Sequence, residues 1–443
     1  MTRSTRGPGA IVWIAAAILS VPSVGAGQAN APVVTLAEAR QRAGMVDPSS
    51  ITARGDVTTA VWERRAARAD LFTPRLSGTM GYGRTSKPFI NFGTFEVTRN
   101  STSATLDASY SLLGSGKRGE LRRANAALQS AEASETAARF RTALATDEAY
   151  FAVLENRELS RVAADRLKRA QEQLTIARVR VVAGDALATD SLQLLLEVNR
   201  ARLEVLRRDS ALTVSRLRLG THIGLSGPAD AAPVDSSVSP PLPLTQEDAI
   251  REMRDRGPEI ESARAVERRA DALFDKEREG YFPDIVVGGT MGAFDEDFFP
   301  AAARRSQLTL SLSMPFWDGG QRELAMARAR TQRDVSRAER EGEERAAAAA
   351  MAETYHGYQT SRAGTELALV GVGVAAETYR VQGVRYREGA TTILDLLEAQ
   401  VALSQAEADL VQARYGTRIA LAKIEALLGR RLFEQTNTES TNR

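Results

Sequence analysis

Cysteine is absent from the sequence, which excludes disulfides, thiol catalysis, cysteine-based zinc or iron–sulfur sites and a lipid-modified N-terminal cysteine. His222 and His356 are the only histidines, so neither a histidine-built metal site nor a Ser-His-Asp triad has enough residues. The glycines mark turns and form no phosphate-cradling loop. We therefore predict a protein that is not an enzyme and that needs no metal or cofactor.

Net charge and long apolar runs are also scarce. The 58 basic and 56 acidic residues nearly cancel, so the chain carries no electrostatic footprint for nucleic acid. After the N-terminus, no stretch reaches the ~20 consecutive apolar residues that a transmembrane helix requires. If the mature protein lies in a membrane, it must therefore cross the membrane with strands. Alanine, arginine, glutamate and leucine dominate the composition, which indicates long helices.

The N-terminus has the pattern of a secretory signal peptide. Arg3 and Arg6 form a positive region, residues 10–21 form a short apolar core, and residues 24–26 fit a small-x-small cleavage site. The alternative is a membrane anchor, but the apolar run is too short to span a bilayer. We expect a signal peptide at 1–26 and an exported protein.

A tandem duplication organises the rest of the chain. Gly-Thr-Met-Gly occurs at 78–81 and again at 289–292, each time after aromatic residues and a proline. Three later landmarks repeat at an offset of 205 residues, namely Gly184 and Gly389, Asp190 and Asp395, and Gly224 and Gly429. A period this long excludes a solenoid and indicates two equal modules. We expect a first repeat at 27–224, a Pro/Ser-rich linker at 225–244, a second repeat at 245–432 and a polar tail at 433–443.

Each module carries two candidate strands, at about 75–84 and 103–113 and at about 284–293 and 306–315. Apolar Leu106 and Ala108 alternate with polar Thr105 and Asp107, which is the period of a strand with two unlike faces. The lengths suit tilted membrane strands, and flanking aromatic residues suit a membrane interface: Phe72, Phe316 and Trp317. The alternative is a soluble β-sandwich, which two hairpins cannot build beside long helices. Four strands cannot close a barrel alone, so several chains must share it.

Four long helices complete the modules, at about 117–182, 186–224, 321–388 and 392–429. The first is free of proline and spans about 100 Å, so these helices must pack as coiled coils. In the last helix, two apolar lines lie on different faces, which indicates neighbours on both sides, as in a wall of helices. Gly184 and Gly389 end the first helix of each pair, so both turns lie at the same far end, where Thr189 or Thr392 would cap the next helix.

With these features the chain resembles the TolC-like outer membrane efflux protein family. The resemblance is carried by the signal peptide, the duplication, MPFWDGGQRELAMARA at 314–329 and YREGATTILDLLEAQVALSQAEADL at 386–410. It implies an α+β membrane protein in which two tandem repeats each hold a β-hairpin and a long α-helical coiled-coil hairpin. It also implies a homotrimer with a 12-stranded β-barrel in the outer membrane of a Gram-negative bacterium, continued by an α-helical barrel across the periplasm. An inner-membrane pump and a periplasmic adaptor would dock on this passive exit duct.

The same resemblance places functional residues at the helix turns. Gate links fall on Asp190 and Tyr386, and a ring of constriction carboxylates falls on Asp395 and Glu398. Some members of the family carry arginine where this chain has Thr391, and Arg387 is the candidate substitute. The alternative for the two carboxylates is an ordinary solvated helix face.

The turns themselves are the candidate contact with the adaptor, and simple turn geometry is the alternative. They comprise Val182, Ala183, Gly184 and Asp185 in the first repeat and Arg387, Glu388, Gly389 and Ala390 in the second. The competing function is a periplasmic coiled-coil adaptor without a pore. An adaptor has one helical hairpin with flanking β-domains, whereas this chain has two equal hairpins and amphipathic strand pairs.

Overall fold

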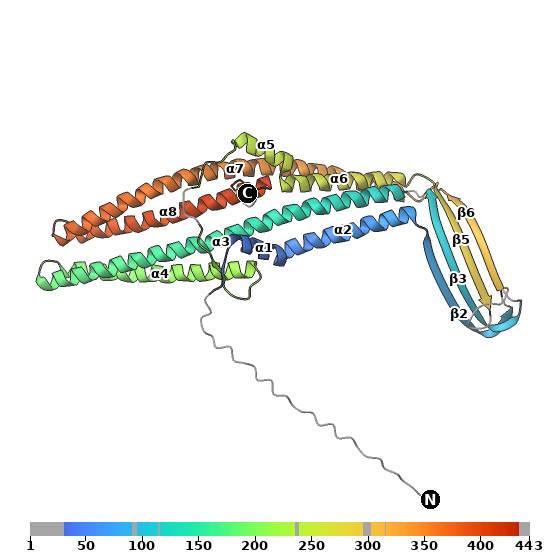
Figure 1. Cartoon of the computed structure of the whole chain (residues 1–443), viewed down its shortest axis with the longest axis horizontal. Coiled ribbons are helices and arrows are strands. Elements are labelled where there is room, and N and C mark those ends of the chain that lie inside the picture. The colour runs from blue at the N-terminus through green and yellow to red at the C-terminus, as the bar shows by residue number, and fades with distance from the viewer. Residues whose placement is uncertain are drawn as a thin grey trace, which may run out of the picture.

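The computed structural model describes residues 31–90, 95–113, 116–234, 239–295, 303–314 and 316–433. The expected signal peptide and the tail from residue 434 onward lie outside them. The molecule is elongated, with a four-stranded sheet at one end and two helical hairpins reaching to the other (Figure 1). The described helices are α1 Leu36–Val46, α2 Pro48–Phe72, α3 Lys117–Ala183, α4 Ala188–His222, α5 Gln246–Arg256, α6 Pro258–Glu279, α7 Gln321–Arg387 and α8 Ile393–Leu428.

The sheet is antiparallel and follows the order β2, β3, β5, β6. Its strands are β2 Arg75–Ile90, β3 Val97–Leu113, β5 Asp284–Asp295 and β6 Ala303–Ser313. A second, two-stranded parallel sheet pairs β1 Val33–Val34 with β4 Asp230–Ala231. Because β4 lies inside the stretch expected to be a linker, part of that stretch is ordered structure, which pairs with the N-terminal segment and contacts α3 and α4.

Both repeats begin with a helix pair that the sequence analysis did not anticipate. In the first pair, Thr35 caps α1 and Pro48 opens α2, and in the second Thr245 caps α5 and Pro258 opens α6. The two prolines stand 210 positions apart, and proline is favoured at the first helical position because its missing N–H has no partner there. The repeat unit is therefore two helices, two strands and two more helices.

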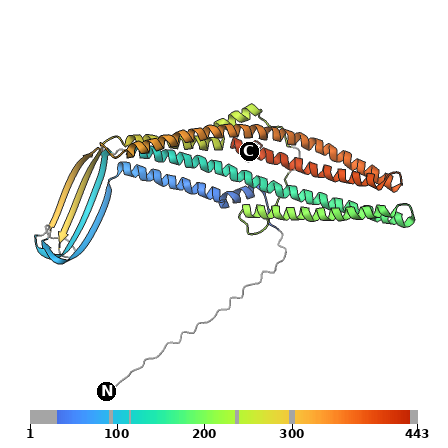
Figure 2. The same ribbon diagram turned by 180° about the vertical axis from the view of Figure 1, so that it is seen from behind.

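The helices form one curved layer that continues the sheet. Next to the sheet the packing order is α2, α3, α6, α7, which matches the order of the strands that these helices adjoin. Toward the far end the order becomes α4, α3, α8, α7, because α4 and α8 fold back against the 67-residue helices α3 and α7 (Figure 2). At Gly119 the layer is tight: a Cβ there would lie 2.7 Å from Glu279 Oε2, which accepts a hydrogen bond from the Gly119 N–H.

The core near the middle of the layer contains a buried carboxylate. Asp147 on α3 is 1% exposed and accepts two hydrogen bonds from Arg40 on α1, at 2.6 and 2.8 Å. Arg431, which follows α8, lies 3.3 Å from the same carboxylate and 2.7 Å from Glu425. These ion pairs fix α1 and the segment directly after α8 to the centre of α3.

Among the described residues, no helix is both long enough and apolar enough to cross a membrane.

Candidate functional site

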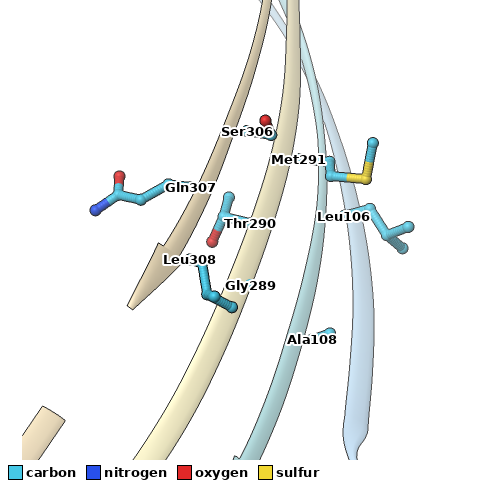
Figure 3. Close-up of a pocket in the computed structure, with 8 residues that line it drawn as sticks. All are labelled: Leu106, Ala108, Gly289, Thr290, Met291, Ser306, Gln307 and Leu308. Carbon is cyan, nitrogen blue, oxygen red and sulfur yellow. The ribbon is translucent and has the colours of Figure 1, made fainter. Parts of the chain in front are cut away.

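The four-stranded sheet has one apolar and one polar face. Leu106 on β3 stands opposite Gly78 on β2 and Met291 on β5, and the side chains of Leu106 and Met291 point to the same side (Figure 3). On the other side, the Thr290 hydroxyl donates to Asp107 Oδ1 at 2.8 Å. A hollow on this sheet lies where Gly289, between Ala108 and Leu308, carries no side chain (Figure 3).

The apolar face is exposed in the single chain. Leu308, Leu310 and Leu312 on β6 are 81%, 71% and 71% exposed. Soluble monomers rarely expose a continuous apolar surface of this kind, which marks a site of contact with lipid or protein. The strands β2 and β6 are also the edges of the sheet, and within the described residues neither has a partner on its outer side.

Aromatic side chains cluster where the strands join the helices. Phe72 ends α2 and is 66% exposed, while Phe316 and Trp317 follow β6 and are 88% and 82% exposed. These are the three residues that the sequence analysis assigned to a membrane interface, and that role remains a proposal. Asp318 accepts a hydrogen bond from the Arg322 N–H at 3.1 Å, which satisfies a free donor in the first turn of α7.

The two helix turns at the far end share one backbone geometry. Gly184 and Gly389 adopt positive φ angles of 86° and 73°, which glycine accepts without a steric cost. The Asp185 N–H donates to the Arg180 carbonyl at 2.9 Å, and the Ala390 N–H donates to the Arg385 carbonyl at 2.8 Å. All eight residues expected to contact an adaptor are exposed, as their place in these turns requires.

In the second turn, Asp395 serves as part of a helix cap. Its carboxylate accepts hydrogen bonds from the Thr392 N–H at 3.0 Å and from the Thr392 and Thr391 hydroxyls at 2.7 and 2.8 Å. These hydrogen bonds lower the pKa of the Asp395 carboxyl below its usual value. Glu398, one turn further along α8, is exposed. Of the two threonines considered as caps, Thr392 is the cap, whereas Thr189 lies inside the first turn of α4.

In the first turn the equivalent carboxylate has a different environment. Position 187, which corresponds to Thr392, is a leucine, and α4 begins without a side-chain cap. Asp190 instead acts electrostatically on Tyr386 of the second hairpin. The expected gate link between these two residues remains a prediction, because within the described residues the Tyr386 hydroxyl forms no hydrogen bond to Asp190.

Tyr386 lies in an apolar cluster between the two hairpins. It is 2% exposed and packs with Leu174, Leu194 and Leu396. Burial raises the pKa of its hydroxyl, the charge of Asp190 raises it further, and Arg180 opposes both effects. Within the part of the chain that the structure describes, this hydroxyl has no hydrogen-bond partner.

Arg180 is the residue of this site that sequence reasoning missed. Its guanidinium donates to the backbone carbonyl of Tyr386 and stands over the Tyr386 ring, 5.0 Å from the centroid. Arg387, the expected substitute for the arginine missing at Thr391, donates instead to the Gly383 carbonyl on its own helix. In the sequence, Arg180 resembles any basic residue near a helix C-terminus, and its partner carbonyl is 206 positions away.

The site contains no metal-binding arrangement in the described ranges, where no three His, Asp or Glu side chains are grouped to hold an ion. Its chemistry is limited to hydrogen bonding, charge and packing. An arrangement of this kind can hold helices together or release them, and it can present charge to a passing solute.

Comparison with protein families places both repeats in one family. The sequence profile described as Outer membrane efflux protein matches residues 52–225 and 249–430. Outer membrane protein OprJ of Pseudomonas aeruginosa is 26% identical over 316 residues, which make up 69% of this chain and 65% of that protein. The aligned part is thus slightly less than two thirds of the length of this relative.

Solved structures share the fold. The CmeC outer membrane channel of Campylobacter jejuni superimposes with a TM-score of 0.78 and 16% identity, covering 90% of this chain and 87% of that one. The open state of the MtrE outer membrane channel of Neisseria gonorrhoeae gives a TM-score of 0.75 and 20% identity, covering 90% and 91%. At these identities the likeness concerns the fold, and it includes both the sheet and the helical layer.

Proposed function

Because the chain belongs to the outer membrane efflux protein family, we propose that it forms the exit duct of a tripartite efflux or type I secretion system. As a member of this family it is an outer membrane efflux channel and not an enzyme. The proposal adds passive conduction, a homotrimer, and docking of a periplasmic adaptor and an inner-membrane pump.

The observation that carries the proposal is that the layer has two open edges. One edge runs along β2, α2 and α4, and the other runs along β6 and α7. A sheet edge in lipid must be paired, because unpaired backbone groups there cost several kcal/mol each. Further copies of the chain would close the edge, and three copies would supply the twelve strands of a barrel.

Exposed apolar seams on the two edge helices support the same closure. On α4 and on α7 these side chains are three, four or seven residues apart, with one gap of eleven residues on α4, and this spacing resembles a coiled-coil seam. The seam on α4 comprises Leu192, Leu196, Leu203, Leu206 and Leu217, and the seam on α7 comprises Leu367, Val370, Val374, Val381 and Val384. In the trimer, α4 of one protomer would pack against α7 of the next and extend the barrel as a tube of helices.

We place the gate and the constriction at the hairpin tips. Asp190 and Tyr386 would restrain the tip, and Asp395 and Glu398 of three protomers would put six carboxylates around the pore, a field that favours cations. The cap formed with Thr392 holds Asp395 in a fixed orientation, which supports a defined ring. The exposed tip residues would receive the adaptor, and the match over both repeats favours a duct over the alternative of a pore-free adaptor.

Single-channel recording in a planar bilayer tests this function. We expect small, cation-selective openings from the purified trimer, and loss of selectivity in the double variant Asp395→Ala/Glu398→Ala. The control removes two exposed carboxylates elsewhere on the helical layer, Glu339→Ala/Glu343→Ala, and should preserve selectivity. Unchanged ion selectivity in Asp395→Ala/Glu398→Ala would indicate that the two carboxylates lie on an ordinary solvated helix face and do not line a constriction. Failure to form trimers or to associate with membranes would refute the proposed duct.

A further inference from the structure

Arg180 connects the two hairpins at their tips. It lies in the last turn of α3, and its guanidinium reaches the last turn of α7, where it contacts both the carbonyl and the ring of Tyr386. The same guanidinium donates to the Asp185 carbonyl in its own turn at 3.0 Å. One side chain thus joins the turn of the first hairpin to the end of the second. Gly389 is also close, since a Cβ there would lie 3.6 Å from Arg180 Nη2.

The repeat-related arginine does not make this connection. Arg385 stands 205 positions after Arg180 and has the same place in the second turn, where it donates to the Ala390 carbonyl at 3.4 Å. That hydrogen bond stays within the turn. The duplication therefore supplies two arginines with the same local role, and only Arg180 is observed to bind the other hairpin in the described structure.

Two further contacts lie above Arg180 on the same side of α3. Arg169 binds Glu407 on α8 at 2.7 and 3.2 Å, and the Gln173 amide donates to the Tyr379 hydroxyl on α7 at 3.2 Å. In both of these contacts a side chain binds another side chain. Arg180 differs because it lies nearest the tip and donates to a backbone carbonyl, that of Tyr386.

The acceptor explains why an arginine suits this position. The Tyr386 carbonyl lies at the C-terminal end of α7, where the helix dipole favours a positive charge. A planar guanidinium can donate to this carbonyl and still face the aromatic ring, which a lysine ammonium does less well. Arg180 therefore stabilises the C-terminus of a helix that belongs to the other hairpin.

We propose that Arg180 is the positioning residue that holds the second hairpin tip against the first, and that the tip opens only when its contacts with Tyr386 break. This inference rests on the proposed function, because it assigns the restraint at the tip of the proposed duct. It differs from the link expected between Asp190 and Tyr386, in which the tyrosine hydroxyl, rather than the carbonyl, would take part.

The test compares Arg180→Ala, Arg180→Lys and the matched control Arg385→Ala in the full-length protein. Loss of a charge-assisted hydrogen bond and a cation–π contact should raise the open probability in a planar bilayer by about fivefold to tenfold. Arg385→Ala should remain within about twofold of the wild type, and Arg180→Lys should restore part of the restraint, as expected for a retained charge. Thermal melting of the trimers checks that all variants are folded.

Amide hydrogen exchange gives a second readout that does not depend on conduction. In Arg180→Ala, the amides of residues 386–391 should exchange several-fold faster than in Arg385→Ala. Equal open probabilities and equal exchange rates in the two alanine variants would overturn the proposal. If every variant is silent, including Asp190→Ala, the proposed duct fails, and the exchange rates alone decide whether Arg180 holds the tip.

Discussion

The two hairpin tips have the same backbone turn but use their side chains differently. Both end a 67-residue helix at a glycine with positive φ, and both place an arginine five residues before a turn carbonyl that it binds. At the second tip, Thr392 engages the aspartate of the next helix in a cap. At the first tip, leucine occupies that position and α4 has no side-chain cap, while the charge of Asp190 contributes to the raised pKa of Tyr386 on the other hairpin. The residue at this one position, threonine or leucine, therefore decides whether the aspartate three residues later takes part in a helix cap.

The difference shows how a duplicated unit acquires two roles. The geometry of the turn depends on glycine and backbone hydrogen bonds, so both copies retain it. Contacts between the hairpins depend on a few side chains, and these differ between the copies. Each of the following changes either removes this asymmetry or makes it easier to measure.

The largest effect is expected at Tyr386, which is buried between the hairpins, whereas its repeat-related residue Val181 is only half-buried. Tyr386→Ala should lower the free energy of unfolding by about 3 kcal/mol, and Val181→Ala by less than about 1 kcal/mol, because less apolar surface and volume are lost. Thermal melting of the trimer followed by circular dichroism measures both. Tyr386→Phe should be nearly neutral, and a large loss would show that the hydroxyl has a partner in the trimer.

The next effect concerns Gln400, a fully buried amide on α8 at the position where the first repeat has Leu195. Neither amide atom has a hydrogen-bond partner within the described ranges. Gln400→Met should therefore stabilise the protein by about 1–2 kcal/mol, since a buried polar group is removed at similar volume. Gln405→Met, at an exposed position of the same helix, is the control and should change the melting temperature little. Destabilisation by Gln400→Met would mean that assembly supplies the missing partner.

Exchanging the caps tests the comparison directly. Thr392→Ala should destabilise the start of α8 by about 1 kcal/mol, while Leu187→Thr should stabilise the start of α4 by about 0.5–1 kcal/mol, because Asp190 then stands three residues after a threonine. Hydrogen exchange in the first turn of each helix reports both changes. Leu187→Thr should also draw Asp190 away from Tyr386. Unchanged hydrogen-exchange protection in the first turn of α4 would show that the backbone around position 187 does not allow a threonine to form the cap.

The smallest effect is the acid dependence of the second tip. The cap lowers the pKa of Asp395, so its contribution to stability is present above the ordinary value of 3.8 and is lost as pH falls through the lower folded pKa. Exchange at the start of α8 should therefore rise only below about pH 4. The acid dependence should shrink in Thr392→Ala, which lacks the threonine hydroxyl donor. Equal profiles in the wild type and this variant would contradict the assignment of the cap.

Most of the architecture was accessible to sequence reasoning because it depends on simple periodicity. Alternating residues on β3 and the proline-free stretch of α3 predict a strand and a long helix without reference to distant parts of the chain. Of the helices that open each repeat, α2 is hard to predict because it buries only Ser50 and Ala60 and so lacks a clear apolar period. The caps and prolines at an offset of 210 residues were the available signal.

The candidate site was less accessible because its contacts cross between repeats. The spacing of Thr392 and Asp395 is a capping pattern, which by itself indicates a structural role for that aspartate. The contact of Arg180 with the Tyr386 carbonyl leaves no such pattern, since a backbone acceptor places no constraint on residue type. Side chains that bind distant backbone are therefore the part of this site that only the three-dimensional fold reveals.

The unpaired strand edges also impose an order of events on the biogenesis of the protein. A single chain inserted in lipid would leave the backbone groups of β2 and β6 without partners, at a cost that rises with every residue of the two strands. Recruitment of sister chains must then precede or accompany insertion, so the rate of insertion should depend steeply on chain concentration. Until the ring closes, each unpaired edge strand can pair with a strand of an unrelated chain. Dilution of the protein delays ring closure and so lengthens the time during which such incorrect pairing can occur.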